Sequence, residues 1–282
     1  MRTFFLFLLY SLTLLSCNKK NNSPPESQGT NFIRLLKTVT TTDAGTITTE
    51  TYTYNGSGLL TGSQRITPAS SGNTADIFTQ AFYRNSSGKP DSITVAGTRA
   101  DTFYYKTFTR FYYDFAGKLS YSVNRTYIPN TTTINSRDSS VYFYSGNVVE
   151  HRDDYSSAGA GPYGARSRQL FYQYDAAGNL SSLRAEVVDA GTIPPGLIIN
   201  TSLYTYDNNS NPLPDNRSLY FSLVTLFYYD YKSVNNPVIV DNGNWGTKYT
   251  YEYRFSANNK PLYRKGKETG TTHFTETLFY YD

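Results

Sequence analysis

Cysteine, tryptophan and methionine each occur once in the 282 residues, and histidine occurs twice. A single cysteine excludes intrachain disulfides and sites built from several thiolates. The two histidines, His151 and His273, come without a second set of metal ligands, so we expect no catalytic metal and no cofactor. The net charge of +4 is spread along the chain without a block of Lys and Arg, which gives no indication of nucleic-acid binding.

Catalytic motifs are also missing from the sequence, which has no nucleophile elbow and no phosphate-cradling loop. His151 is followed by Arg152, Asp153 and Asp154, and the Ser- and Gly-rich stretch after them favours a solvated loop over an acid–base cluster. A glycosidase would need two carboxylates about 5 to 10 Å apart across a cleft. The recurring aspartates of this chain stand at turn positions instead. The sequence therefore predicts no catalytic residue and a protein that is not an enzyme.

The N-terminal apolar run covers residues 4–15, which is short of the roughly 20 residues that a membrane-spanning helix needs. Preceded by Arg2, it is typical of a signal-peptide core. Its ending, Leu14-Leu15-Ser16-Cys17, resembles the lipobox of bacterial lipoproteins, which implies cleavage before Cys17 and acylation of that residue. The alternative is an ordinary signal peptide with an incidental cysteine. Lipidation is favoured because the only cysteine of the chain stands at the cleavage point.

Three segments follow from this interpretation. Residues 1–17 form the lipoprotein signal peptide, and residues 18–30, rich in Asn, Ser and Pro, form a flexible tether. Residues 31–282 form the folded domain. We expect the protein at the outer membrane, held by its lipid anchor and facing either the periplasm or the cell surface.

One motif recurs about nine times along the folded domain: aromatic, any residue, aromatic, Asp or Asn, two residues, Gly, Lys or Asn, then Leu or Pro. The clearest copies run over residues 52–60, 111–119 and 172–180. A period of about 30 residues accommodates two strands and two connections. The sequence therefore predicts an all-β antiparallel meander of about 16 to 18 strands, built from repeated hairpins.

The motif has the chemistry of a tight turn. An Asx side chain accepts hydrogen bonds from the backbone two residues on, and glycine takes the left-handed conformation that a type I turn with a bulge requires. A degenerate copy carries Asn259 at the glycine position, which is the next most tolerant residue. The residues expected to form turns are Asn55, Gly58, Asp114, Gly117, Asp175 and Gly178.

A meander of this length cannot remain flat, because twist accumulates and open edges invite pairing. We therefore expect the sheet to curl into an open or closed barrel. In residues 248–255, Tyr and Phe alternate with Lys, Thr, Glu and Arg, which indicates one solvated face. A transmembrane barrel is the alternative, but polar residues such as Thr107, Thr109 and Arg110 interrupt the aliphatic outer face that it would need.

At these motifs the chain resembles the YD-repeat (RHS-type) family, whose sequences recur as Tyr-Asp-x-x-Gly-Asn/Arg-Leu. It is also similar to uncharacterised bacterial lipoprotein domains described as having a porin-like β fold. The resemblance covers roughly residues 31–282 and implies architecture far more than activity. The long YD-repeat arrays of toxins enclose a cargo domain, whereas this chain has few repeats and no such domain.

Two functions remain open at this stage. The first is a non-enzymatic binding or structural β-repeat module, with the membrane as partner through the anchor and a glycan or an envelope protein as a further partner. The second is a glycan-binding or glycan-processing accessory protein, since aromatic rings can stack on sugars. The lone Trp245, in a Gly- and Asn-rich loop, is the candidate ligand platform, and its alternative role is to cap one end of the barrel.

Overall fold

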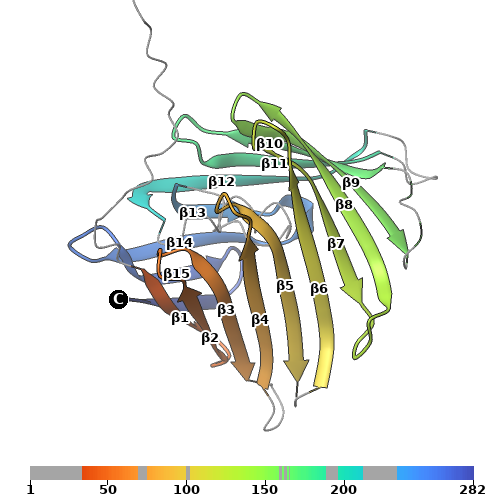
Figure 1. Ribbon diagram of the computed structural model, residues 1–282. Helices are drawn as coiled ribbons and strands as arrows, with labels where there is room; N and C mark the ends of the chain where they lie inside the picture. Colours follow the sequence, from red (N-terminus) through yellow and green to blue (C-terminus); the bar gives the residue numbers. More distant parts are fainter. Residues whose placement is uncertain are drawn as a thin grey trace, which may run out of the picture. The chain divides into compact units, whose positions relative to one another are not determined.

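The computed structural model describes residues 34–68, 75–99, 102–158, 161, 164, 166–188, 196–211 and 234–282. Within these residues sixteen antiparallel strands form one closed barrel (Figure 1). Each strand pairs with its neighbours in the sequence, and β1 closes the barrel by pairing with β16. The predicted all-β meander is confirmed, and of the two forms expected from the sequence the closed barrel is the one present. No helix in this part of the chain has the length and apolar character needed to cross a membrane.

The elements are β1 (Leu35–Thr42), β2 (Ile47–Tyr54), β3 (Leu60–Pro68), β4 (Ala75–Arg84), β5 (Pro90–Arg99), β6 (Thr102–Tyr113), β7 (Leu119–Tyr127), β8 (Ile134–Ser145), β9 (Val148–Ala158), β10 (Arg166–Tyr174), β11 (Leu180–Val187), β12 (Ile198–Ser210), β13 (Asn235–Asp241), the short 3-10 helix η2 (Gly243–Trp245), β14 (Lys248–Phe255), β15 (Pro261–Glu268) and β16 (Phe274–Tyr281).

The connections of the meander alternate between the two ends of the barrel. The turns of the repeated motif, at residues 55–59, 85–89, 114–118, 146–147, 175–179 and 256–260, all lie at one end, which we name the motif rim. β1 begins and β16 ends at this same rim. The connections after β1, β7, β13 and β15 lie at the other end, which we name the opposite rim.

The first aromatic residue of the motif forms the core. In seven copies it points to the inner side of the wall and is at most 9% exposed. These residues are Tyr52, Phe82, Phe111, Tyr142, Tyr172, Tyr204 and Phe279. The leucine that opens the return strand packs beside them, as at Leu60, Leu119 and Leu180. Burial of each such side chain contributes roughly 1.5 to 3 kcal/mol, so the repeat places one anchor per hairpin near the motif rim.

In several copies the second aromatic of the motif links its hairpin to the preceding strand pair, as at Tyr54, Tyr113, Tyr206 and Tyr281. The Tyr113 hydroxyl donates to the carbonyl of Pro90 at 2.5 Å, and the Tyr281 hydroxyl donates to that of Pro261 at 2.8 Å. Each of these two acceptors is the first residue of the return strand one hairpin earlier. Arg84, the non-aromatic exception, donates through its guanidinium to the matching carbonyl of Leu60 at 3.3 Å. The position therefore favours a long side chain with a donor at its tip, a role that the sequence pattern alone did not indicate. The copy with Phe255 lacks this donor, and Tyr253 donates to the carbonyl of Pro237 at 2.9 Å instead.

Three motif turns show how the Asx and glycine positions cooperate. The Asp114 carboxylate accepts the backbone N–H of Lys118 at 2.8 Å, and Asp175 accepts that of Asn179 at 2.9 Å. Asn55 makes the equivalent bond to residue 59 at 2.9 Å. The glycines all have left-handed φ values, 79° at Gly58, 76° at Gly117 and 87° at Gly178. The degenerate copy has Asn259 at a φ of 56°.

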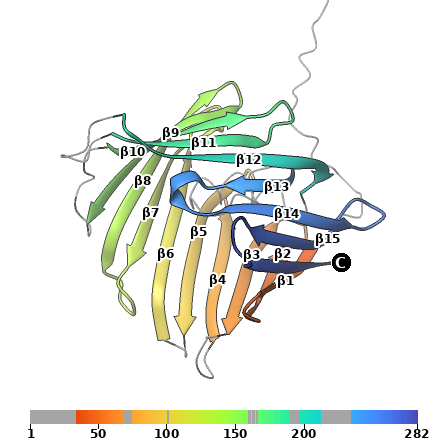
Figure 2. The ribbon, with the colours of Figure 1, turned by 180° about the vertical axis from the view of Figure 1, so that it is seen from behind.

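The seam between β1 and β16 joins the two ends of the described domain (Figure 2). The backbone N–H of Asp282 donates to the carbonyl of Arg34 at 3.1 Å. At the opposite rim, Nδ1 of His273 lies 2.5 Å from a carboxylate oxygen of Asp43. No role could be predicted for His273 from the sequence, whereas the structure places it in a contact that spans 230 residues of chain.

Gly178 offers a clean test of the turn geometry, because an added Cβ would meet no atom within 4 Å. Gly178→Val should destabilise the protein by about 1 to 2 kcal/mol, since a side chain is strained in the left-handed region. Gly178→Asn should cost much less. Chemical denaturation of both variants checks this, and equal stability would mean that the turn assignment is wrong. Gly117 is less suitable, because the Lys89 side chain occupies the space that a Cβ would need.

The His273–Asp43 contact should make the seam sensitive to pH. The hydrogen bond and charge of Asp43 raise the pKa of His273, so its stabilisation is complete below the unfolded value of about 6.5 and disappears as pH rises through the folded value. The hydrogen bond from His273 lowers the pKa of Asp43, so that contribution is lost only as pH falls below about 3.8. His273→Gln should therefore lower the denaturation midpoint at pH 5.5 more than at pH 9. An equal difference at both pH values would show that the contact contributes no pH-dependent stability.

Candidate functional site: a buried ionic cluster on the inner wall

Four polar side chains meet on the inner side of neighbouring strands. Ser140 of β8, Arg152 and Asp154 of β9 and Arg168 of β10 form what we name the ionic cluster. Ser140 and Asp154 are paired residues in one ladder, and Asp154 and Arg168 are paired in the next. The side chains of Arg152 and Asp154 are only 3% and 12% exposed, whereas that of Arg168 is 29% exposed. The cluster therefore lies largely within the wall, with one arginine open to solvent.

The Asp154 carboxylate is the centre of the cluster. Nε of Arg152 lies 2.8 Å from its Oδ1, and a terminal nitrogen of Arg152 donates to Oδ2 at 2.9 Å. Arg168 donates to Oδ2 at 2.8 Å, and the Ser140 hydroxyl donates to Oδ1 at 2.8 Å. Burial by itself would raise the pKa of Asp154, but the two arginines lower it below its usual value. The carboxylate is therefore ionised, and with two arginines the cluster carries a net charge of +1.

Two buried tyrosines flank Arg152 on the inner face. The hydroxyls of Tyr142 and Ser122 share a hydrogen bond at 3.0 Å. Burial raises the pKa of Tyr142 well above its ordinary value, and it also raises that of Tyr172, where Arg152 opposes the shift. Both phenols are therefore neutral at physiological pH. They add hydrogen-bonding groups around Arg152 without adding charge.

A further carboxylate, Asp138 of β8, differs from Asp154 in its environment. Burial raises the pKa of Asp138, a hydrogen bond from Asn124 opposes the rise, and the charge of Asp154 adds to it. Asp138 and Asp154 do not act as a pair of acid–base carboxylates, because Asp154 already accepts hydrogen bonds from two arginines and a serine. Asp154 is therefore poorly suited to accept a proton.

The structure corrects the interpretation of residues 151–154 as a solvated loop. All four lie inside β9, and Arg152, Asp153 and Asp154 are buried. The reason is charge complementarity across the ladder: Asp153 accepts from Arg166 at 2.8 Å on the outer side, just as Asp154 accepts from Arg168 on the inner side. One sequence signal could have indicated this burial. Two adjacent aspartates, Asp153 and Asp154, are followed on the next strand by two arginines, Arg166 and Arg168.

His151 lies on the outer wall in a row of rings. Its imidazole stacks on Phe143 with ring centroids 4.2 Å apart, and Phe171 lies 5.8 Å away on the other side. Arg184 continues the row at 4.7 Å from the Phe171 ring centre. His151 is thus part of a cross-strand packing ladder. Among the described residues, no group of three or more His, Cys, Asp or Glu side chains could hold a metal ion.

The remaining candidate residues do not join the ionic cluster. The six predicted turn residues lie at the motif rim. Trp245 belongs to η2 at the opposite rim, and its side chain lies outside the described part. The η2 segment packs closely on β12, because an added Cβ on Gly243 would clash with the backbone of Thr201. Cys17 lies outside the described residues, as do the signal peptide and the tether that the sequence predicts.

Breaking the ionic cluster should destabilise the barrel strongly. Arg152→Met removes an ion pair and a hydrogen bond to Asp154 from a buried site, and we expect a loss of about 3 to 5 kcal/mol in the free energy of unfolding. Arg184→Met on β11 is the matched control, because Arg184 is 45% exposed and pairs with Glu186 at the surface. It should cost at most about 1 kcal/mol. Similar losses for both variants, measured by denaturant unfolding, would contradict a special role for the cluster.

The barrel has clear counterparts among solved structures. A porin-like protein from Bacteroides uniformis superposes with a TM-score of 0.51 at 12% sequence identity, over 88% of this chain and 98% of the other. A porin-like protein from Bacteroides vulgatus gives a TM-score of 0.53 at 13% identity, over 89% and 99% of the two chains. No protein-family model matches the sequence, and neither does any curated protein. At this level of identity the likeness establishes only the fold, a porin-like β-barrel. The resemblance to YD-repeat proteins that the sequence motif suggests stays a prediction.

Proposed function

We propose that the protein is a non-enzymatic, lipid-anchored β-barrel of the bacterial outer membrane, with a wall that faces water and a binding or structural role. The observation that carries this proposal is a row of charges across the outer wall of β14, β15 and β16. Glu252, Lys265 and Glu276 stand at paired positions on these three strands. Nζ of Lys265 lies 3.3 Å from the Glu276 carboxylate.

This row is costly to place in lipid. A lysine or arginine on the lipid-facing side of a barrel costs about 2 to 4 kcal/mol at the middle of the bilayer. Lys248, Glu252 and Arg254 are all exposed on the outer side of β14, alternating with inward tyrosines. Such a surface is suited to water, which supports a tethered barrel over a membrane-spanning one. Three polar residues were expected from the sequence to interrupt a lipid-facing wall. Only Arg110 lies on the outer wall, since Thr107 and Thr109 are buried on the inner side.

The lipid anchor would attach through Cys17, which supplies the membrane contact that the outer wall of the barrel does not. The polar residues 18–30 would separate the acylated cysteine from the first strand. The chain enters β1 at Leu35 on the motif rim. A protein held in this way needs no membrane-spanning strand to stay at the membrane.

The alternative of glycan recognition loses its main support. Tyr52, Tyr142, Tyr172 and Tyr204 are only 4 to 6% exposed, so their rings are packed in the core cluster. They cannot serve as open platforms for sugar rings. Glycan binding through Trp245 stays a prediction, because the side chain of that residue lies outside the described part. We assign the ionic cluster no catalytic step.

Cys17→Ala tests the anchor. In the wild-type protein we expect acylation, cleavage before Cys17 and recovery with the membrane fraction. The variant should lose incorporation of labelled palmitate and lose processing at that site, because the acylated residue is absent. Ser23→Ala, in the predicted tether, is a control that should behave as the wild type. If the Cys17→Ala protein remains membrane-bound and is cleaved at the same position, the lipid-anchor proposal fails.

A further inference from the structure

We propose that the motif rim is seated on the lipid surface, with a belt of exposed aromatic residues entering the headgroup region. This inference rests on the lipid anchor of the proposed function and adds a second contact, made by the barrel itself. Five aromatic side chains form the rim belt: Tyr83, Phe115, Tyr121, Phe143 and Tyr280. They are 53%, 105%, 40%, 39% and 42% exposed, respectively.

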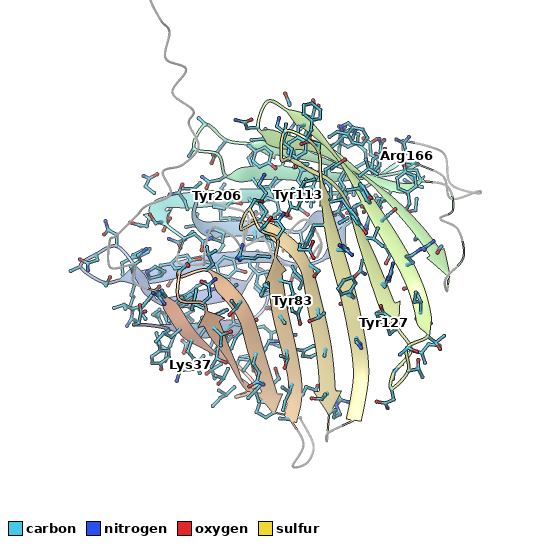
Figure 3. The ribbon with its side chains drawn as sticks, in the orientation of Figure 1. Lys37, Tyr83, Tyr113, Tyr127, Arg166 and Tyr206 are labelled. Carbon is cyan, nitrogen blue, oxygen red and sulfur yellow. The ribbon has the colours of Figure 1, made fainter. Side chains whose placement is uncertain are left out.

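All five lie close to the motif rim. Phe115 is at the tip of the turn between β6 and β7, and Tyr83 and Tyr280 are one residue from the rim-side ends of their strands. Tyr121 and Phe143 stand two residues from such ends. Figure 3 labels Tyr83 on β4, and it labels Tyr113 and Tyr127 at the two ends of the hairpin formed by β6 and β7.

The two rims differ in the kind of apolar residue that they expose. Among side chains whose exposure is described, all the exposed aromatic ones are those of the rim belt. Exposed apolar residues near the opposite rim are aliphatic, such as Ile47 and Ile128. Tyrosine and tryptophan are enriched where a membrane meets water, because their rings are apolar and their tips are polar. Three of the five belt residues are tyrosines, and the two phenylalanines add apolar surface. The belt thus has the composition of an interfacial surface.

Cations accompany the belt. Nζ of Lys37 lies 4.5 Å from the centre of the Tyr280 ring, and the Arg110 guanidinium lies 5.7 Å from that of Tyr112, which stacks on Tyr121. Long basic side chains can keep their charge at lipid headgroups while their stems cover apolar surface. This pairing of aromatic rings with basic groups fits a surface that contains anionic phospholipids.

The charges beyond the belt limit how deeply the rim can enter. On β15, Leu262 is exposed beside the rim, and Lys265 follows three residues later. At about 3.3 Å per residue, the stretch of β15 between the rim and Lys265 is about 10 Å tall, whereas Arg254 on β14 and Asp91 on β5 lie one residue from the rim-side ends of their strands. Interfacial elements are buried by roughly 5 to 10 Å. The rim can therefore enter the headgroup region, where Arg254 can stay beside the phosphates, before the row of Glu252, Lys265 and Glu276 would have to leave water.

The course of the chain favours lipid over another occupant of the belt. The residues between Cys17 and β1 reach the barrel at the motif rim, where Arg34 is hydrogen-bonded to Asp282. These 16 or so residues span at most about 55 Å when extended. An anchor attached there brings the rim belt toward the membrane and leaves the opposite rim facing away. A second copy of the chain or a partner protein has no comparable link to this end of the barrel.

Tryptophan fluorescence can test the seating with the full, lipidated chain. The native Trp245 lies at the opposite rim, so Trp245→Phe removes the background signal. Phe115→Trp and Ile128→Trp, each added to Trp245→Phe, place one indole on the turn before β7 or on the turn after it. The proteins are reconstituted into vesicles of phosphatidylethanolamine and phosphatidylglycerol whose acyl chains carry bromine, which quenches nearby indoles.

We expect the emission of the Phe115→Trp protein to shift to shorter wavelength and to lose most of its intensity, while the Ile128→Trp protein is unchanged. Absence of quenching in both would overturn the inference, as would equal quenching in both, which indicates a barrel inserted through its full height. Protection of the Phe115→Trp indole from aqueous iodide without bromine quenching would also overturn it, because a second copy or a protein partner then covers the rim.

Flotation of the same vesicles separates this inference from the proposed function. A protein that does not float with the vesicles lacks the lipid anchor, and the proposed function fails. A protein that floats without quenching of the Phe115→Trp indole retains its anchor, and only the rim seating is wrong. If Trp245→Phe prevents folding, the two substitutions are made in the native sequence and the emission of the wild type is subtracted.

Discussion

The hydrogen bond from one hairpin to the strand start of the hairpin before it is the interaction on which the rest of this barrel depends. An isolated hairpin has two unpaired strand edges and an uncovered apolar face. If it paired with its neighbour through backbone hydrogen bonds alone, the register between the two could slip. A donor at the end of a long side chain, the hydroxyl of Tyr113 or the guanidinium of Arg84, must reach one particular carbonyl. That requirement fixes the stagger between successive units. The inward position of the first aromatic and the turn geometry are then repeated around the wall.

This dependence explains what could be predicted from the sequence. Local chemistry repeats visibly, so the hairpins, the Asx-glycine turns and the alternation over residues 248–255 could all be predicted without coordinates. Closure could not be predicted, because it depends on the summed twist and stagger of sixteen strands and on the pairing of β1 with β16. The ionic cluster was also missed. Residues 151–154 have no apolar alternation, and only their partners Arg166 and Arg168, on the next strand, make burial favourable.

Charged side chains are distributed differently on the inner and outer sides of the barrel wall. Near the motif rim, aromatic rings fill the inner side and few charges are buried. Farther along β9 and β10, a carboxylate is buried with two arginines, whose hydrogen bonds to it offset part of the desolvation cost. On the outer wall, charges stand in cross-strand rows, as at Lys265 and Glu276. The protein thus combines a fold whose solved counterparts are porin-like with an outer surface that is much more polar than a lipid-facing wall.

β1 begins and β16 ends at the same rim, and this limits how such a barrel can change size in evolution. Duplication or loss of one repeat adds or removes two strands, so closure is kept with an even number and both chain ends stay where they were. Loss of a single strand would send one end to the far side and pair the closing strands in parallel. The circumference of the barrel can therefore change by whole hairpins, while the rim at which the domain begins and ends stays the same.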